Sequence, residues 1–101
     1  TAVASLFADD PSVTVLAGSW RETLHAEAPF DLVFVNASDA KDDIDATIGL
    51  LAPGGTAILD CFSSDVLAPD ARRDSWLHDP TLSAVEVWVT PVRRALVAVR
   101  L

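Results

Sequence analysis

The sequence predicts a mixed α/β fold in which a largely parallel sheet ends in an antiparallel β-hairpin. Helix-type and strand-type hydrophobic patterns alternate along the chain. Residues 31–35 are apolar on both faces, which is typical of a parallel strand covered by helices on both sides. Near the end, residues 84–90 and 95–101 read as two strands joined by a turn at residues 91–93.

The first part of the chain is expected to contain two helices and a strand. Residues 1–8 read as the end of a helix, which stops before Pro11. Residues 13–17 form a short β-branched run, typical of a strand. Ser19 and Glu22 have the spacing of a capping box at the start of a second helix, which Pro29 keeps brief.

After the strand at residues 31–35, helix and strand patterns continue to alternate. Residues 40–52 have helical spacing, with acids near the start, and residues 53–55 end this helix. Residues 56–60 are expected to be another buried strand, and residues 71–77 a helix. The predicted order is therefore α-β-α-β-α-β-α-β-β.

Length and composition favour a single globular domain, or part of one, over residues 1–101. Half of the residues are hydrophobic, and no apolar run reaches the roughly 20 residues that cross a bilayer. The net charge of −8 argues against nucleic acid or an anionic membrane as the main partner. The lone Cys61 fits a reducing, cytoplasmic setting. Because the chain starts at Thr1, we expect it to begin inside a longer product.

Polar residues follow each predicted parallel strand, at Ser19-Trp20, Asn36 and Asp60-Cys61. In open α/β sheets, ligands bind outside the carboxyl ends of the parallel strands. The sequence therefore predicts that Ser19, Asn36 and Asp60 converge on one ligand-binding rim.

Three segments and the final hairpin carry a family resemblance. Residues 13–20, 29–37 and 51–60 resemble successive blocks of class I S-adenosylmethionine-dependent methyltransferases, most of all the small O-methyltransferase branch. The last two strands are similar to that family's closing hairpin. The resemblance covers essentially the whole chain as the C-terminal part of such an enzyme. It implies a Rossmann-like, three-layer αβα fold that transfers a methyl group to a small acceptor, with a hydroxyl as the expected group.

The resemblance also implies roles for individual residues in binding S-adenosylmethionine. Ser19 and Trp20 would lie beside the adenine, with serine where the family usually has an acid, and Asn36 would face the cofactor. Ser19 could also serve only to cap its helix. Lys41 resembles a lysine that helps to deprotonate the acceptor in related enzymes. The alternative is a solvated lysine near the start of its helix.

The metal site of metal-dependent family members is expected to be absent here. Those enzymes place acids where this chain has Asn36, Asp60 and Cys61, and only Asp60 is retained. Magnesium prefers charged oxygen ligands, whereas asparagine is neutral and cysteine is too soft a donor.

The remaining polar and aromatic residues are given structural interpretations. His25 and His78 are expected at the surface, and Trp20, Trp76 and Trp88 are expected to serve packing. The arginine pairs at residues 72–73 and 93–94 are expected to be solvated.

Neither the family's glycine-rich loop nor its first two strands has a counterpart in these residues. Residues 32–35 are therefore expected to form an unpaired apolar edge, and residues 13–17 to lack neighbours. We expect these residues alone to be unstable or oligomeric and not to methylate. One alternative is a degenerate, non-catalytic docking or dimerisation module. A homodimer is among the expected assemblies. Another is part of a nicotinamide-dependent dehydrogenase, which predicts further parallel strands after Asp60.

Overall fold

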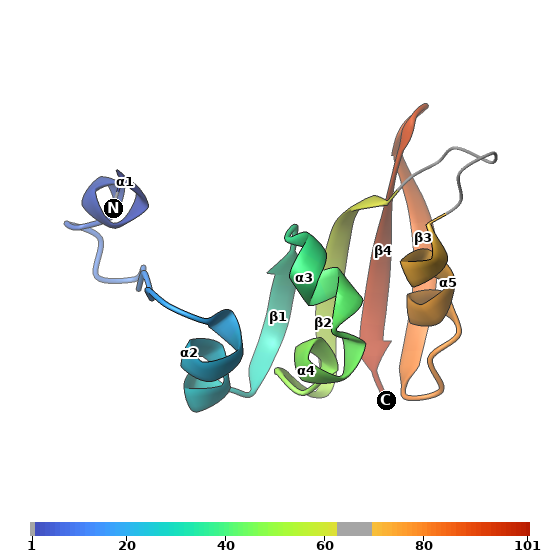
Figure 1. The fold of residues 1–101 in the computed structure, drawn as a ribbon, viewed down its shortest axis with the longest axis horizontal. Helices are drawn as coiled ribbons and strands as arrows, with labels where there is room; N and C mark the ends of the chain where they lie inside the picture. Colours follow the sequence, from blue (N-terminus) through green and yellow to red (C-terminus); the bar gives the residue numbers. More distant parts are fainter. Residues whose placement is uncertain (1, 63–69) are drawn as a thin grey trace.

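The computed structural model of the chain describes residues 2–62 and 70–101, and Figure 1 shows the arrangement of its helices and strands. In chain order the elements are α1 (Ala2–Leu6), α2 (Trp20–Glu27), β1 (Phe30–Val35), α3 (Ser38–Asp42), α4 (Ile44–Ile48), β2 (Leu51–Phe62), α5 (Ala71–Leu77), β3 (Leu82–Thr90) and β4 (Arg93–Arg100).

The described strands form one mixed sheet in the order β1-β2-β4-β3. β1 pairs with β2 in parallel, and β4 pairs antiparallel with both β2 and β3. The predicted closing hairpin is therefore confirmed. The strands described after Asp60 are antiparallel, contrary to what the dehydrogenase alternative predicts. The chain is thus a mixed α/β protein with an edge strand, β1, as expected.

The core lies between the sheet and the helices α3, α4 and α5, which lie in front of it in Figure 1. Trp76 of α5 is fully buried, and its indole Nε1 donates to the backbone carbonyl of Lys41 at 3.0 Å. Leu59 of β2 and Leu96 of β4 are also fully buried and face this layer. The expected packing role of Trp76 is confirmed.

The predicted strand at residues 13–17 does not form. This segment has no regular structure, and most of it is exposed, including Val15 and Leu16. Together with α1 it makes an arm that projects away from the sheet (Figure 1). A strand needs a neighbour to satisfy its backbone hydrogen bonds, and the described residues supply none beside this segment.

The predicted helix at residues 40–52 is also wrong in its extent. It is divided into α3 and α4, because Asp43 has a non-helical backbone and its side chain accepts a hydrogen bond from the Ala46 amide. It starts earlier, at Ser38, and ends at Ile48. Residues 51–55 belong to β2, with Gly54 at a φ of +80°.

The expected third layer is not found among the described residues. The side chains of Leu32 and Phe34 on β1 are 61% and 63% exposed, on the sheet face opposite the helices. The expectation that helices cover both faces of β1 is therefore wrong for the described residues. These residues form two layers, one of helices and one of strands.

None of the described helices is long and apolar enough to cross a membrane.

Candidate functional site

A pocket of about 190 Å³ opens at the carboxyl end of β1. Residues from the start of α2, the end of β1 and the α3–α4 region surround it. Its lining is mainly apolar and consists of Trp20, Leu24, Val33, Phe34, Val35, Asn36, Ala37, Ala40, Thr47 and Leu50. The pocket lies at the carboxyl end of a parallel strand, which is where a ligand site was predicted.

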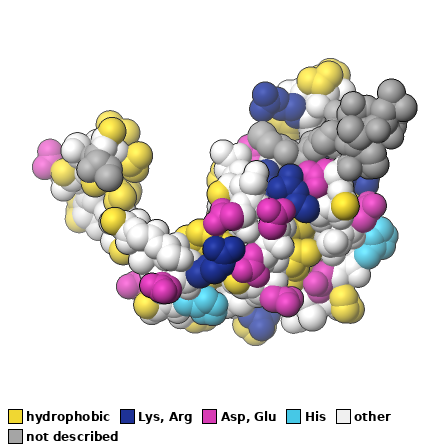
Figure 2. Space-filling view, in the orientation of Figure 1, with side chains coloured by type: hydrophobic (Ala, Val, Ile, Leu, Met, Phe, Trp, Pro, Cys, Tyr) yellow, Lys and Arg dark blue, Asp and Glu magenta, His cyan; other side chains and the backbone are white. Residues whose placement is uncertain are grey.

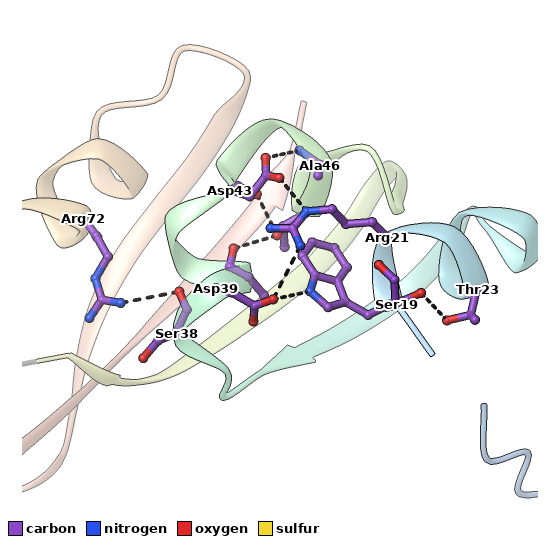
Figure 3. Close-up of polar contacts among 11 residues, drawn as sticks. Ser19, Arg21, Thr23, Ser38, Asp39, Asp43, Ala46 and Arg72 are labelled. Carbon is purple, nitrogen blue, oxygen red and sulfur yellow. Dashed lines mark hydrogen bonds and ion pairs between the residues drawn. The ribbon is translucent and has the colours of Figure 1, made fainter. Parts of the chain in front are cut away.

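Two carboxylates hold the α2 wall of this pocket. The indole Nε1 of Trp20 donates to Asp39 Oδ2 at 2.8 Å, and Arg21 Nε donates to Asp43 Oδ2 at 2.8 Å. Figure 3 shows Arg21 reaching across from α2 toward both acids. Its guanidinium also lies 4.6 Å from the centre of the Trp20 ring. These contacts fix the orientation of the Trp20 ring at the pocket.

The same contacts change the acidity of the two carboxyl groups. The hydrogen bond from Trp20, helped by the charge of Arg21, lowers the pKa of Asp39. The hydrogen bond from Arg21 and a second one from the Ala46 amide lower the pKa of Asp43. Both groups are therefore ionised at neutral pH, which keeps the α2 wall in place.

Ser19 lies directly before α2 but does not form the predicted capping box. Its backbone is extended, as at an N-cap, yet its side chain makes no capping hydrogen bond. Its carbonyl instead accepts from the Thr23 amide and hydroxyl, at 3.0 Å each. Trp20, rather than Ser19, reaches the pocket lining.

Asn36 and Asp60 follow adjacent parallel strands. Val35 pairs with Leu59, so the next residue on each strand, Asn36 and Asp60, lies at the same edge of the sheet. Asn36 lines the pocket and Asp60 does not. Of the three predicted rim residues, only Asn36 lines the pocket, joined by Trp20, which follows Ser19. Asp60 lies at the same edge of the sheet, on the neighbouring strand.

Residues 2–62 and 70–101 contain no group of three or more histidine, cysteine or acidic side chains that could hold a metal ion. The side chain of Cys61 lies outside the described residues. Asn36 and Asp60 lie at the same edge of the sheet and supply one carboxylate between them.

Lys41 is buried, with 2% of its surface exposed, so the interpretation of a solvated lysine is wrong. It does not line the pocket. Its charge lies close enough to Asp70 to help lower the pKa of that carboxyl, after the larger effect of the hydrogen bonds from Arg72. Lys41 therefore lies close to Asp70, the N-cap residue of α5.

Sequence reasoning missed several residues that shape the pocket. Asp39 and Arg21 position Trp20, while the buried Thr47 lines the pocket and donates its hydroxyl hydrogen to the Ala40 carbonyl. These are contacts between segments about 20 residues apart or between two helices. The acids near the start of the predicted helix, which include Asp39 and Asp43, were the available signal for these contacts. They were interpreted only as favourable charges at the positive end of the helix dipole.

An ion cluster away from the pocket corrects the expectation of solvated arginines for Arg73 and Arg94, whereas Arg93 is exposed as expected. Glu86 accepts hydrogen bonds from Arg73 and, at 2.7 Å, from Arg94, and all three side chains are largely buried. Arg94 also lies 4.3 Å from the centre of the Trp88 ring. Trp88 itself is 57% exposed, so its expected packing role is wrong.

The expected surface positions of His25 and His78 are confirmed. Figure 2 shows acidic side chains spread over the helix-covered face of the protein, with arginines among them.

Neither a scan against protein-family models nor a search of curated proteins found a match. Among solved structures, the chain is similar to cofactor-bound Rv0187 from MTB, with a TM-score of 0.70 and 25% sequence identity. The match covers 96% of this chain and 53% of that one, so the chain spans about half the length of this relative. The fold is therefore shared with a cofactor-bound protein.

Proposed function

We propose that the chain is part of an S-adenosylmethionine-dependent methyltransferase with a Rossmann-like fold, which methylates a hydroxyl of a small molecule. The observation that carries this proposal is the pocket at the carboxyl end of β1, bordered by Trp20 and Asn36. The similarity to a cofactor-bound protein supports a cofactor-binding role. The order of β1, β2 and the closing hairpin is what the methyltransferase resemblance implies.

The pocket residues suit the adenosine part of such a cofactor. The apolar lining would exclude water from a flat base, the Trp20 ring would stack on it, and the Asn36 amide could donate or accept a hydrogen bond. Bound in this way, the cofactor supplies an electrophilic methyl group for in-line displacement. The protein's part is positioning. The role of Lys41 as the base stays a prediction. Its side chain is buried close to Asp70 and does not line the pocket.

The first test is binding of S-adenosylhomocysteine to the 101-residue chain, followed by NMR. We expect weak binding, because the chain has no glycine-rich loop for the methionine part. The indole N–H signal of Trp20 and the side-chain amide of Asn36 should shift on titration. No methyl transfer by these residues alone is expected.

Matched variants make this test specific. Trp20→Ala and Asn36→Ala should each abolish the shifts, whereas Trp88→Ala, which changes the same residue type far from the pocket, should keep them. Shifts that persist in both pocket variants, or equal shifts with a nicotinamide nucleotide, would reject the proposal.

A degenerate, non-catalytic docking module is the second candidate. The exposed apolar side chains of Leu32 and Phe34 favour it. Calorimetry with S-adenosylhomocysteine separates the two candidates, since a module without a cofactor site should release no heat at any concentration.

A further inference from the structure

Asp39 is a negatively charged residue directly beside the candidate pocket. It lies in the first turn of α3, between the lining residues Ala37 and Ala40, and its Oδ2 accepts the hydrogen bond from the Trp20 indole at 2.8 Å. Its side chain is 57% exposed and does not line the pocket. The carboxylate is therefore at the rim, where it acts on the part of a ligand that stays in solvent.

The arginines around α3 are already held by carboxylates. Each of the two contacts a pair of acids: Arg21 contacts Asp39 and Asp43, and Arg72 contacts Asp42 and Asp70. Figure 3 shows Arg21 with its two acids, and Arg72 directed toward the Ser38 carbonyl on the same helix. Four carboxylates against two guanidinium groups leave this surface with a negative charge balance.

The other basic residues of the chain are placed elsewhere. All seven lysines and arginines of the sequence lie in the described part of the chain, and none of them lines the pocket. Arg73 and Arg94 bind Glu86, and Arg100 donates to the Leu51 carbonyl. An anionic ligand group at the pocket would therefore have to compete with carboxylates for its partner.

The size of the pocket determines which part of a ligand meets this charge. At about 190 Å³ it is smaller than the roughly 300–1,000 Å³ of pockets that enclose a whole ligand. Its lining is mainly apolar, which suits a flat base. The sugar and any phosphate on it would then remain at the opening, where exposed charges act over about 10 Å in 0.1 M salt.

We propose that Asp39 makes this pocket selective for adenosine compounds that carry no phosphate. The inference rests on the proposed function, because it takes the pocket to bind an adenosine group. A phosphate would bring negative charge to a surface whose balance is already negative, and it could pair with Arg21 only at the expense of two carboxylates. An uncharged or cationic adenosine compound meets no such repulsion.

The test compares adenosine with adenosine 5′-monophosphate by NMR titration of the Trp20 indole signal. In about 0.1 M salt, the wild-type chain should bind the monophosphate at least about threefold more weakly. Asp39→Asn keeps an oxygen that can accept from Trp20 but removes the charge, so the affinity ratio should fall toward one. Asp31→Asn makes the same charge change at the exposed amino end of β1, roughly 16 Å along the strand from Asn36, and should keep the ratio.

The ratio of the two affinities separates selectivity from a general loss of binding. If Asp39→Asn loosens the pocket, both ligands weaken together, and the ratio still reports the charge. Equal binding of the two ligands by wild type, an unchanged ratio in Asp39→Asn, or the same change in Asp31→Asn would overturn this inference and leave the proposed function standing. A Trp20 signal that does not respond to adenosine would overturn both.

Discussion

Replacing Trp76 by phenylalanine tests whether the packing between α5 and the sheet stabilises the fold. The indole is fully buried, and its Nε1 is 3.0 Å from the Lys41 carbonyl oxygen. Phenylalanine leaves a small cavity, at about 1–2 kcal/mol, and removes the donor to a carbonyl in a buried region, at about 1 kcal/mol. We therefore expect Trp76→Phe to lower the free energy of unfolding by about 2–3 kcal/mol.

This loss is large beside the roughly 5–15 kcal/mol that stabilises a domain of this size. Urea unfolding followed by far-ultraviolet circular dichroism measures it without relying on tryptophan fluorescence. Trp88→Phe is the matched control, because Trp88 is 57% exposed and should cost no more than about 0.5 kcal/mol. If both variants lose the same stability, our account of the core is wrong.

Two further predictions concern the ion cluster and the glycines of β2. Hydrogen bonds from two arginines lower the pKa of Glu86 below its ordinary 4.5, so the unfolded state binds more protons near that pH and stability falls as the pH drops. Glu86→Gln should be less stable than wild type at neutral pH, and the difference should shrink below pH 4.5 in acid-unfolding curves. In thermal unfolding, Gly55→Ala should cost more than Gly54→Ala. A Cβ at Gly55 would lie 2.8 Å from the Ala52 carbonyl oxygen, whereas at Gly54 only the φ of +80° is strained, at about 1 kcal/mol. Equal acid sensitivity of Glu86→Gln and wild type, or a reversed order of the glycine variants, would count against these explanations.

The parts of the fold that were predicted correctly depend on local signals. The range of α5 was predicted from its helical pattern and the following proline, and Asp70 caps it through the Arg72 amide. The hairpin followed from alternation around Pro91. Both elements are specified within a few residues of chain, so they could be read without knowing their neighbours.

The errors arise where tertiary contacts decide the outcome. A β-branched run at residues 13–17 favours a strand only if another strand lies beside it, and none is described there. Asp43 interrupts a helix because its side chain bonds to the Ala46 amide and to Arg21 of a distant helix. The burial of Lys41 depends on α5 packing over it, which no local pattern shows.

The candidate site was predicted in part for the same reason. Asn36 lines the pocket directly after β1, where the rule about strand ends places it. Trp20 also lines the pocket, although the strand predicted before it at residues 13–17 does not form. The residues that orient Trp20, Asp39 and Arg21, were missed because their contacts join α2 to α3 across the fold.

The anchoring of Trp20 has a consequence for any ligand of the pocket. The acids that hold α2 are more than one-third exposed, with Asp39 at 57% and Asp43 at 37%. Dissolved ions weaken attractions between exposed charges, so the ion pairs of Arg21 with Asp39 and Asp43 hold α2 less tightly as ionic strength rises. Even an uncharged ligand would therefore bind to a more rigid pocket at low ionic strength than at high ionic strength.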